Sequence, residues 1–226
     1  KQAGIVFDVE LKNQTNLSRI SYLTGHGDDW YSTAVLEVQY KKADGAWYSI
    51  GRLKKNTSDF FKWKYIDEDE TTQHLSFISH SFLDENGTDL GAMGEFLAIN
   101  FFDQQKQLVP IDIIQTPDPN VQYLFDEPNK AIYSPNRSNS TYFDEIYFVR
   151  TAYEHIHRLP IYENTHPPFG KTLIGVGMEV FGVHPFGWRV MGVLAGGLSV
   201  LVLYLFAMKM FQKPLFAICG SVLLMS

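Results

Sequence analysis

An uncharged run of 19 residues, from Val190 to Met208, restricts the folding of this chain more than any other feature. At about 1.5 Å of rise per residue, a helix of this length reaches roughly 28 Å, close to the hydrocarbon thickness of a bilayer. Buried helices of water-soluble proteins are seldom so long and so apolar. The sequence therefore predicts a transmembrane helix over residues 190–211.

Charged residues are distributed unevenly about Arg189. All 25 acidic residues precede it, whereas residues 189–226 contain three basic residues and no acidic ones. Residues 1–188 carry 16 Lys and Arg, which leaves them a net charge of −9. This composition is typical of an aqueous domain, and its negative charge argues against nucleic acid as a partner.

The basic residues near the predicted span indicate how the chain is oriented. Lys209 and Lys213 lie at its far end and mark the cytoplasmic side by the positive-inside rule, although Arg189 favours the opposite orientation. We therefore expect a multi-pass protein of the cell membrane whose residues 1–189 lie outside the cytoplasm.

A second apolar segment without charge covers residues 214–226 and stops before it could cross a bilayer. The chain also begins at Lys1, without an initiator Met or a signal-like start. We therefore expect residues 214–226 to be a truncated second transmembrane helix, and the chain to be a fragment that is inactive by itself. The single cysteine, Cys219, lies in this segment, so no intrachain disulfide can form.

Residues 1–114 are rich in strand signals and poor in helical periodicity. Apolar and polar residues alternate from Ala34 to Lys41, and Asp44-Gly45 then provides a turn before the apolar segment Trp47–Ile50. This pattern predicts an antiparallel hairpin with one buried face. Because further short apolar runs follow up to residue 114, we expect an all-β domain that forms a two-sheet sandwich.

Two segments of this region resemble the galactose-binding-like, or discoidin-like, jelly roll. One is the hairpin Asp44-Gly45-Ala46-Trp47, and the other is the late strand Glu95–Asp103, which begins with an acidic residue. The resemblance implies sugar binding through aromatic side chains of loops, for which Trp30, Tyr31 and Trp47 are the candidates. The alternative is that these rings fill the core or its rim.

A linker and two helices are expected between the β domain and the membrane. Residues 115–140 contain four prolines and no sustained period, which predicts the linker. Apolar residues then recur at helical spacing, so we expect a helix over residues 143–158 that begins with a capping box from Thr141 to Asp144. Leu173–Val183 is apolar but too short to span, and Lys171 ahead of it can snorkel, so a helix in the membrane interface is expected within residues 141–189.

Three short motifs ahead of the predicted span carry residues suited to chemistry. Tyr142–Glu145 contains an acidic pair, His166–Lys171 contains cationic side chains in a loop that two prolines stiffen, and Phe186–Arg189 lies at the membrane entry. Each motif also has a purely structural explanation: acidic residues favoured by a helix start, a polar loop histidine, and anchors at the headgroup level. Their combination suits chemistry on a lipid-borne phosphate at the bilayer surface.

In this order, and together with Phe181-Gly182, the three motifs resemble the first external loop of the protein O-mannosyltransferase family, which belongs to the polytopic GT-C glycosyltransferases. The match covers residues 142–211, roughly a third of the chain. The family's usual His-Pro-Pro-Leu is His-Pro-Pro-Phe here. A large β domain ahead of the acidic motif is not the arrangement of the eukaryotic enzymes and looks more like bacterial relatives known only as lipid-carrier-dependent glycosyltransferases.

The resemblance implies transfer of a hexose, typically mannose, from a polyprenyl phosphate to a hydroxyl such as that of a protein Ser or Thr, with inversion. An attacking hydroxyl must lose a proton, and the family match makes Asp144 the general base and Glu145 the residue that orients the acceptor or a neighbour. Positive groups aimed at the departing phosphate lower the barrier. The candidates for that task are His166, Lys171 and Arg189.

Expected partners are a polyprenyl-phosphate sugar donor, a protein or glycan acceptor, and the lipid bilayer. No spacing of His, Cys and carboxylates indicates a metal site, so no cofactor is required, although an Asp-Glu pair beside a phosphate could recruit magnesium. Two alternatives stay open. One is a membrane-anchored carbohydrate-binding or cell-wall-sensing protein without catalysis, and the other is a transferase that acts on a lipid or wall polymer, as the related aminoarabinose transferases do.

Overall fold

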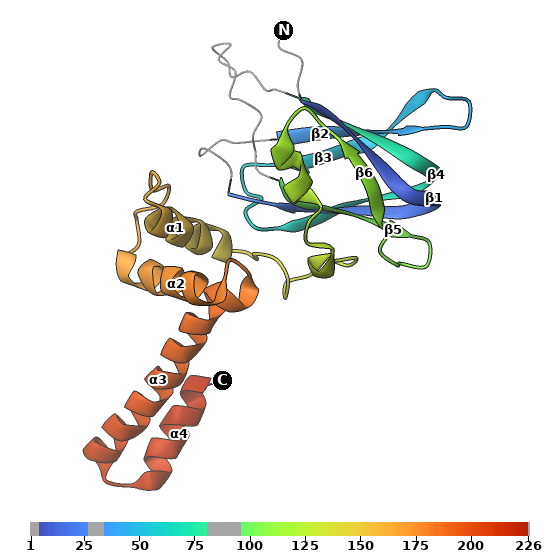
Figure 1. Cartoon of the computed structure of the whole chain (residues 1–226). Coiled ribbons are helices and arrows are strands. Elements are labelled where there is room, and N and C mark those ends of the chain that lie inside the picture. The colour runs from blue at the N-terminus through green and yellow to red at the C-terminus, as the bar shows by residue number, and fades with distance from the viewer. Residues whose placement is uncertain (1–4, 27–33, 81–95, 226) are drawn as a thin grey trace. The chain divides into compact units, whose positions relative to one another are not determined.

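The computed structural model describes residues 5–26, 34–80 and 96–225 (Figure 1). Two of the proposed sugar-binding residues, Trp30 and Tyr31, lie outside the described residues. The chain forms two compact units, Lys1–Ile146 and Tyr147–Ser226, and each has its own architecture.

The first unit is built on antiparallel β-strands. They are β1 (Val6–Thr24), β2 (Ala34–Lys41), β3 (Trp47–Lys55), β4 (Trp63–His80), β5 (Phe96–Asp103) and β6 (Ile111–Gln115). Hydrogen bonds join them in the order β3-β2-β4-β1-β5, and β6 also pairs with β1. The expected antiparallel β domain is therefore confirmed.

The described strands form one hydrogen-bonded sheet, and its division into the two sheets of the predicted sandwich is not observed. Strand β1 is long enough to pair with β6 over residues 8–11 and with β5 over residues 17–24, while β4 follows it along both halves. The register between β1 and β4 shifts between Glu10 and Thr15, and such bulges bend a strand. One bent sheet can thus enclose one core.

All of the first five strands contribute side chains to this core. The rings of Phe7 and Phe77 are stacked with centroids 4.9 Å apart, and Phe125 packs its edge against Phe7. Alternate residues of the strands point inward, as the sequence pattern predicts. The fully buried members are Val9, Leu11, Leu17, Ile20, Val38, Leu53, Leu75, Phe77 and Phe101.

The hairpin between β2 and β3 is confirmed, and local residues explain it. Gly45 has a φ of +84°, which glycine adopts without steric cost. The Asp44 carboxylate accepts hydrogen bonds from the Ala46 N–H at 2.9 Å and from the Tyr48 hydroxyl at 3.1 Å. The acidic residue therefore stabilises the turn itself.

The segment predicted as a linker is partly ordered by contacts with the sheet. It contains two short 3-10 helices, η1 (Pro119–Leu124) and η2 (Pro128–Lys130). The Arg19 guanidinium lies between the rings of Tyr65 and Tyr133, 3.7 and 4.4 Å from their centroids. It also donates to the Tyr133 carbonyl and to the Asp67 carboxylate, each at 2.6 Å. Arg19 thus fastens the segment to β1 and β4.

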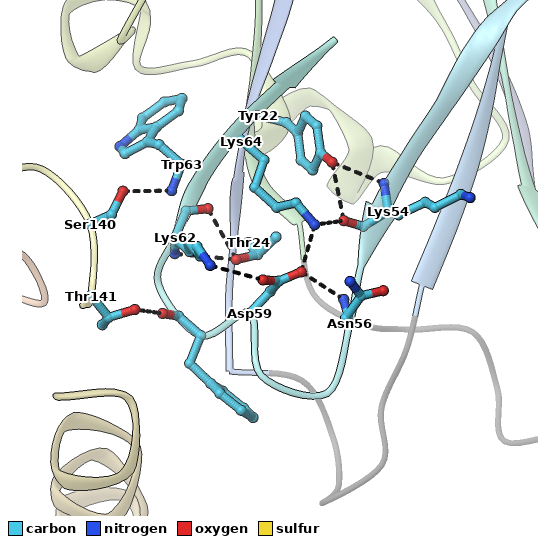
Figure 2. A network of polar contacts seen from close by, with 11 residues as sticks. Tyr22, Thr24, Lys54, Asn56, Asp59, Lys62, Trp63, Lys64, Ser140 and Thr141 are labelled. Carbon is cyan, nitrogen blue, oxygen red and sulfur yellow. Dashed lines mark hydrogen bonds and ion pairs between the residues drawn. The ribbon is translucent and has the colours of Figure 1, made fainter. Parts of the chain in front are cut away.

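A polar network centred on Asp59 holds the loop between β3 and β4 (Figure 2). Its carboxylate accepts from the Lys64 ammonium at 2.6 Å and from the Asn56 N–H at 3.0 Å, and the Lys62 ammonium lies 3.5 Å away. Burial raises the pKa of Asp59, but these hydrogen bonds and charges outweigh it, so the net pKa is below the ordinary value. The loop therefore depends on an ionised carboxylate.

The same loop is attached to the chain just ahead of the acidic pair, as Figure 2 shows. The Thr141 hydroxyl donates to the Phe60 carbonyl at 2.6 Å, and the Ser140 hydroxyl accepts from the Trp63 N–H at 3.0 Å. Both hydroxyl-bearing residues are buried. These contacts lie entirely within the first unit.

Helices form the second unit: α1 (Glu145–His157), α2 (Pro168–Phe181), α3 (Pro185–Phe211) and α4 (Pro214–Met225). Helix α2 begins five residues before the expected Leu173, and α3 begins five before Val190. Proline occupies the first turn of both, where its fixed φ suits a helix and its missing N–H costs nothing. Helix α3 has 27 residues, and an 18-residue stretch of it has a mean hydropathy of 2.3, so it is long and apolar enough to cross a membrane.

Replacing Asp59 by Asn is expected to destabilise the first unit. The variant loses the charge that accepts from Lys64, which costs about 1–3 kcal/mol at neutral pH. Because the pKa of Asp59 is lowered on folding, its contribution is present above the unfolded pKa, near 3.8, and is lost as the pH falls through the folded value. Unfolding of the chain in detergent between pH 7 and pH 2 measures both effects.

The exposed ion pair between Glu127 and Lys130, also 2.6 Å long, provides the matched control. Glu127→Gln should change stability by less than about 0.5 kcal/mol, because exposed pairs contribute little. An Asp59→Asn protein as stable as the unmodified protein at pH 7 would contradict the importance of the buried carboxylate.

Candidate active site

Asp144 is exposed in the turn that leads into α1. The residue before it, Phe143, has a left-handed backbone with a φ of +49°, which is unusual for a side chain of its size. The Asp144 side chain makes no hydrogen bond or ion pair with any described residue. Its carboxylate is therefore available to solvent or to a ligand.

The predicted capping box between Thr141 and Asp144 is not formed. Helix α1 begins only at Glu145, and the Thr141 hydroxyl donates to the Phe60 carbonyl. The Glu145 carboxylate accepts from the Tyr142 N–H at 3.2 Å, which closes the turn that leads into the helix. The two neighbouring acidic residues thus differ: the Glu145 side chain bonds this turn, and the Asp144 side chain does not.

Glu163 organises the loop that contains the second motif. Its carboxylate accepts a hydrogen bond from the Thr165 N–H at 2.6 Å, forms an ion pair with the Lys171 ammonium, and lies 3.3 Å from Nδ1 of His166. The hydrogen bond from Lys171, followed by that from the Thr165 hydroxyl, lowers the pKa of Glu163 well below its ordinary value. The carboxylate is therefore ionised at any physiological pH.

His166 is 62% exposed, and its partners favour one tautomer. An ionised carboxylate accepts but does not donate, so the nitrogen that faces Glu163, Nδ1, carries the proton. Nε2 is then the nitrogen left for a ligand. The ring also packs edge-on against Phe148 of α1, with centroids 5.5 Å apart. The imidazole is thus oriented by one polar and one aromatic neighbour.

Lys171 is placed differently from the expected snorkelling residue. Its side chain is only 2% exposed, and its ammonium donates to the Glu163 carbonyl at 2.7 Å as well as to the Glu163 carboxylate. The reason is that α2 begins at Pro168, so Lys171 lies inside the helix with Glu163 directly against it. In this arrangement, its charge is balanced by Glu163.

A buried ion pair in α1 determines where the 163–171 loop starts. The Arg150 Nε donates to Glu154 at 2.8 Å, and both side chains are buried. Glu154 also accepts from the Tyr162 N–H at 2.8 Å, while the Arg150 guanidinium lies 4.0 Å from the centre of the Tyr162 ring. The residue just before Glu163 is therefore fixed to α1 through both its backbone and its ring.

Helices α2 and α3 approach each other closely at two glycines. A Cβ atom built on Gly177 would lie 2.3 Å from the Gly187 carbonyl oxygen, and one on Gly187 would lie 2.0 Å from the Gly182 carbonyl oxygen. Such distances exclude any side chain at either position. Trp188 is buried beside this contact, and Arg189 is half-buried in the next position of α3.

Trp47 is the one sugar-binding candidate that lies within the described residues. Its side chain is 41% exposed, and the Lys41 ammonium lies 5.8 Å from its ring centre. It borders a cavity of about 150 Å³ together with Asp8, Glu10 and His74. The ring therefore belongs to the rim of the sheet and not to its core.

Metal ligands are not gathered in the part of the chain that the structure describes. No group of three or more His, Cys, Asp or Glu side chains there is close enough to hold an ion. Sequence reasoning did not single out Glu163, which contacts both His166 and Lys171. Its position, three residues before His166 and eight before Lys171, was the available signal.

No family model matches the chain. Over 99 residues, 41% of its length, the chain is 27% identical to a polyprenol-phosphate-mannose–protein mannosyltransferase of Mycolicibacterium smegmatis. Over 88 residues, 36% of its length, it is 31% identical to the protein of that name from Mycobacterium tuberculosis. A stretch of 60 residues, 26% of the chain, is 42% identical to an undecaprenyl phosphate-alpha-4-amino-4-deoxy-L-arabinose arabinosyl transferase of Pseudomonas savastanoi.

The chain covers only 11–19% of the length of these curated relatives. These relatives are named as transferases of sugars carried on polyprenyl phosphates, the class that the three motifs resemble. The resemblance of the β unit to a galactose-binding-like domain is not confirmed.

Replacing Glu163 by Gln is expected to lower the thermal unfolding midpoint of the helical unit, because the buried Lys171 ammonium then faces a neutral partner. Adding Lys171→Met should recover most of the loss, since removal of both charges leaves no buried ion. Calorimetry of the single and double variants in detergent measures this coupling.

The reverse pattern, in which the double variant is less stable than Glu163→Gln alone, would contradict a buried ion pair at this position. Glu127→Gln again serves as the control, since its ion pair with Lys130 is exposed.

Proposed function

We propose that this chain is part of a membrane glycosyltransferase that moves a hexose, most simply mannose, from a polyprenyl-phosphate carrier to a hydroxyl with inversion. The observation that carries the proposal is the exposed Asp144 carboxylate, to which the described residues make no hydrogen bond or ion pair. The names of the partial relatives support the same reaction class.

Asp144 is the proposed general base. It would accept the proton of the acceptor hydroxyl as that oxygen attacks the anomeric carbon, while the lipid phosphate departs from the opposite face. The Glu145 carboxylate accepts from the Tyr142 N–H and so closes the turn that contains Asp144. We therefore propose that Glu145 positions Asp144 and does not contact the acceptor directly.

His166, Lys171 and Arg189 are proposed for the phosphate side. In its doubly protonated form, His166 would donate from Nδ1 to Glu163 and from Nε2 to a phosphate oxygen. Glu163 already neutralises Lys171, so this lysine would act by shaping the loop unless the phosphate displaces that carboxylate. Arg189, at the start of α3, would supply a planar cation that suits phosphate.

The proposed setting is the outer face of a cell membrane, with α3 as the first of several spans. A hydroxyl of a protein Ser or Thr is the proposed acceptor, and a glycan, lipid or wall polymer is the alternative. No metal is assigned to the reaction, although magnesium beside the phosphate is compatible with the acidic pair. The non-catalytic, glycan-binding alternative is not favoured by the names of the relatives.

In the full-length protein, Asp144→Asn is expected to lower kcat by about 10²–10⁴-fold, because it removes the base and keeps the shape. Donor affinity should change little, since the base acts on the acceptor. The measurement is transfer of label from polyprenyl-phosphate-mannose in membranes that contain the intact protein. The Asp118→Asn variant, at the start of η1, is the control, and unmodified turnover by Asp144→Asn would remove Asp144 from the mechanism.

Arg189→Ala is expected to weaken handling of the lipid phosphate and to lower kcat/KM by about tenfold or more. Lys209→Ala removes a positive charge from the last turn of the same helix and should leave donor affinity unchanged. Titration with radiolabelled donor compares the two. If both variants bind donor as the unmodified protein does, and transfer at the same rate, Arg189 is an anchor and not a phosphate ligand.

A further inference from the structure

The loop between β3 and β4, residues 56–62, contacts the chain immediately ahead of Asp144. We propose that this loop is a positioning element for Asp144, so that the β unit takes part in setting the rate of transfer and does not merely recruit an acceptor. The inference rests on the role proposed for Asp144.

Three contacts fasten the segment before the acidic turn to this loop. The Thr141 hydroxyl donates to the Phe60 carbonyl at 2.6 Å, and the Thr141 N–H donates to the Phe61 carbonyl at 3.4 Å. The Ser140 hydroxyl accepts from the Trp63 N–H at 3.0 Å (Figure 2). Thr141 is only 3% exposed, so these bonds are shielded from competing water.

The supporting loop is itself held firmly from two sides. Asp59 joins Lys64 to the Asn56 N–H, and the Thr24 hydroxyl at the end of β1 donates to the Lys62 carbonyl at 3.1 Å and accepts from the Lys62 N–H at 3.2 Å. Figure 2 shows these bonds around one short stretch of loop. The loop is therefore part of the rigid sheet and can transmit its position.

Asp144 lies between two fixed points. Behind it, Thr141 is bonded to the loop, and ahead of it, the Glu145 carboxylate accepts from the Tyr142 N–H. Only Tyr142 and Phe143, the latter in a left-handed conformation, separate Thr141 from Asp144. A base that must lie within hydrogen-bond reach of a hydroxyl loses rate steeply when displaced, by as much as about 100-fold for a shift of about 1 Å.

The test uses the full-length protein with Thr141→Val, which keeps the shape of the side chain and removes the hydroxyl. We expect kcat to fall about 10–100-fold, with donor affinity and the acceptor KM changed less than about twofold. Thr141→Ser restores a hydroxyl that can reach the Phe60 carbonyl and should recover most of the rate. Ser140→Ala gives an independent second lesion at the same attachment.

Thr72→Val is the matched control. Thr72 lies in β4 and is 1% exposed, and its hydroxyl also donates to backbone carbonyls, those of Lys41 and His74. The Thr72→Val variant should lower the unfolding midpoint as Thr141→Val does but leave kcat unchanged. If Thr141→Val and Ser140→Ala keep the unmodified kcat, or if Thr72→Val lowers kcat as much, the positioning role is overturned.

Asp144→Asn in the same assay separates the two proposals. If it abolishes transfer while Thr141→Val does not affect kcat, Asp144 is the base and the loop is only structural. If Asp144→Asn transfers normally, the proposed role of Asp144 fails first, and any effect of Thr141→Val then has another cause.

Discussion

The ion pair between Glu163 and Lys171 is the interaction on which the arrangement of the second motif depends. A buried ammonium is costly unless a carboxylate faces it, and Glu163 lies within reach only because Arg150 and Glu154 fix the preceding residue to α1. The same carboxylate then orients His166. The Glu163 side chain therefore balances the charge at the start of α2, holds the loop before that helix and selects the tautomer of His166.

Asp59 has a comparable structural role in the β unit. It too is an ionised carboxylate that faces a lysine and a backbone N–H, and it too holds a short loop against a rigid element. The difference lies in what each loop carries. Residues 56–62 support the segment ahead of Asp144, whereas the loop at Glu163 carries its own candidate ligand, His166. The proposed base and the proposed phosphate ligands are thus each supported by a separate network, within separate compact units.

Local sequence patterns predicted the local structure well. The Asp44-Gly45 turn, the helix after residue 143 and the apolar helix after Arg189 all follow from residues close together in the chain. Errors arose where distant residues decide the outcome. Thr141 has the right spacing for a cap, but its hydroxyl bonds Phe60, which is 81 residues away. Likewise, the pairing of β1 with β4 along most of their length joins the described strands into one sheet, and no short window reveals that pairing, so the division into two sheets stays a prediction.

The sequence pointed to some residues of the candidate site and not to others for the same reason, and their roles stay predictions. Asp144 and His166 stand out in the sequence, and the structure leaves both exposed. Glu163 was missed because an acidic residue in a polar loop is ordinary by itself. Its importance appears only when α2 brings Lys171 back against it. The burial of Lys171 could not be foreseen either, since it depends on where the helix begins.

At Gly177 and Gly187 the backbones of α2 and α3 lie in direct contact, with no side chain between them. Two helices whose backbones touch must turn together. Spanning helices tilt when the surrounding lipid becomes thinner or thicker. A tilt of α3 in a bilayer would therefore move α2 and Lys171 in its first turn. Membrane thickness would then affect the position of the proposed phosphate-binding residues.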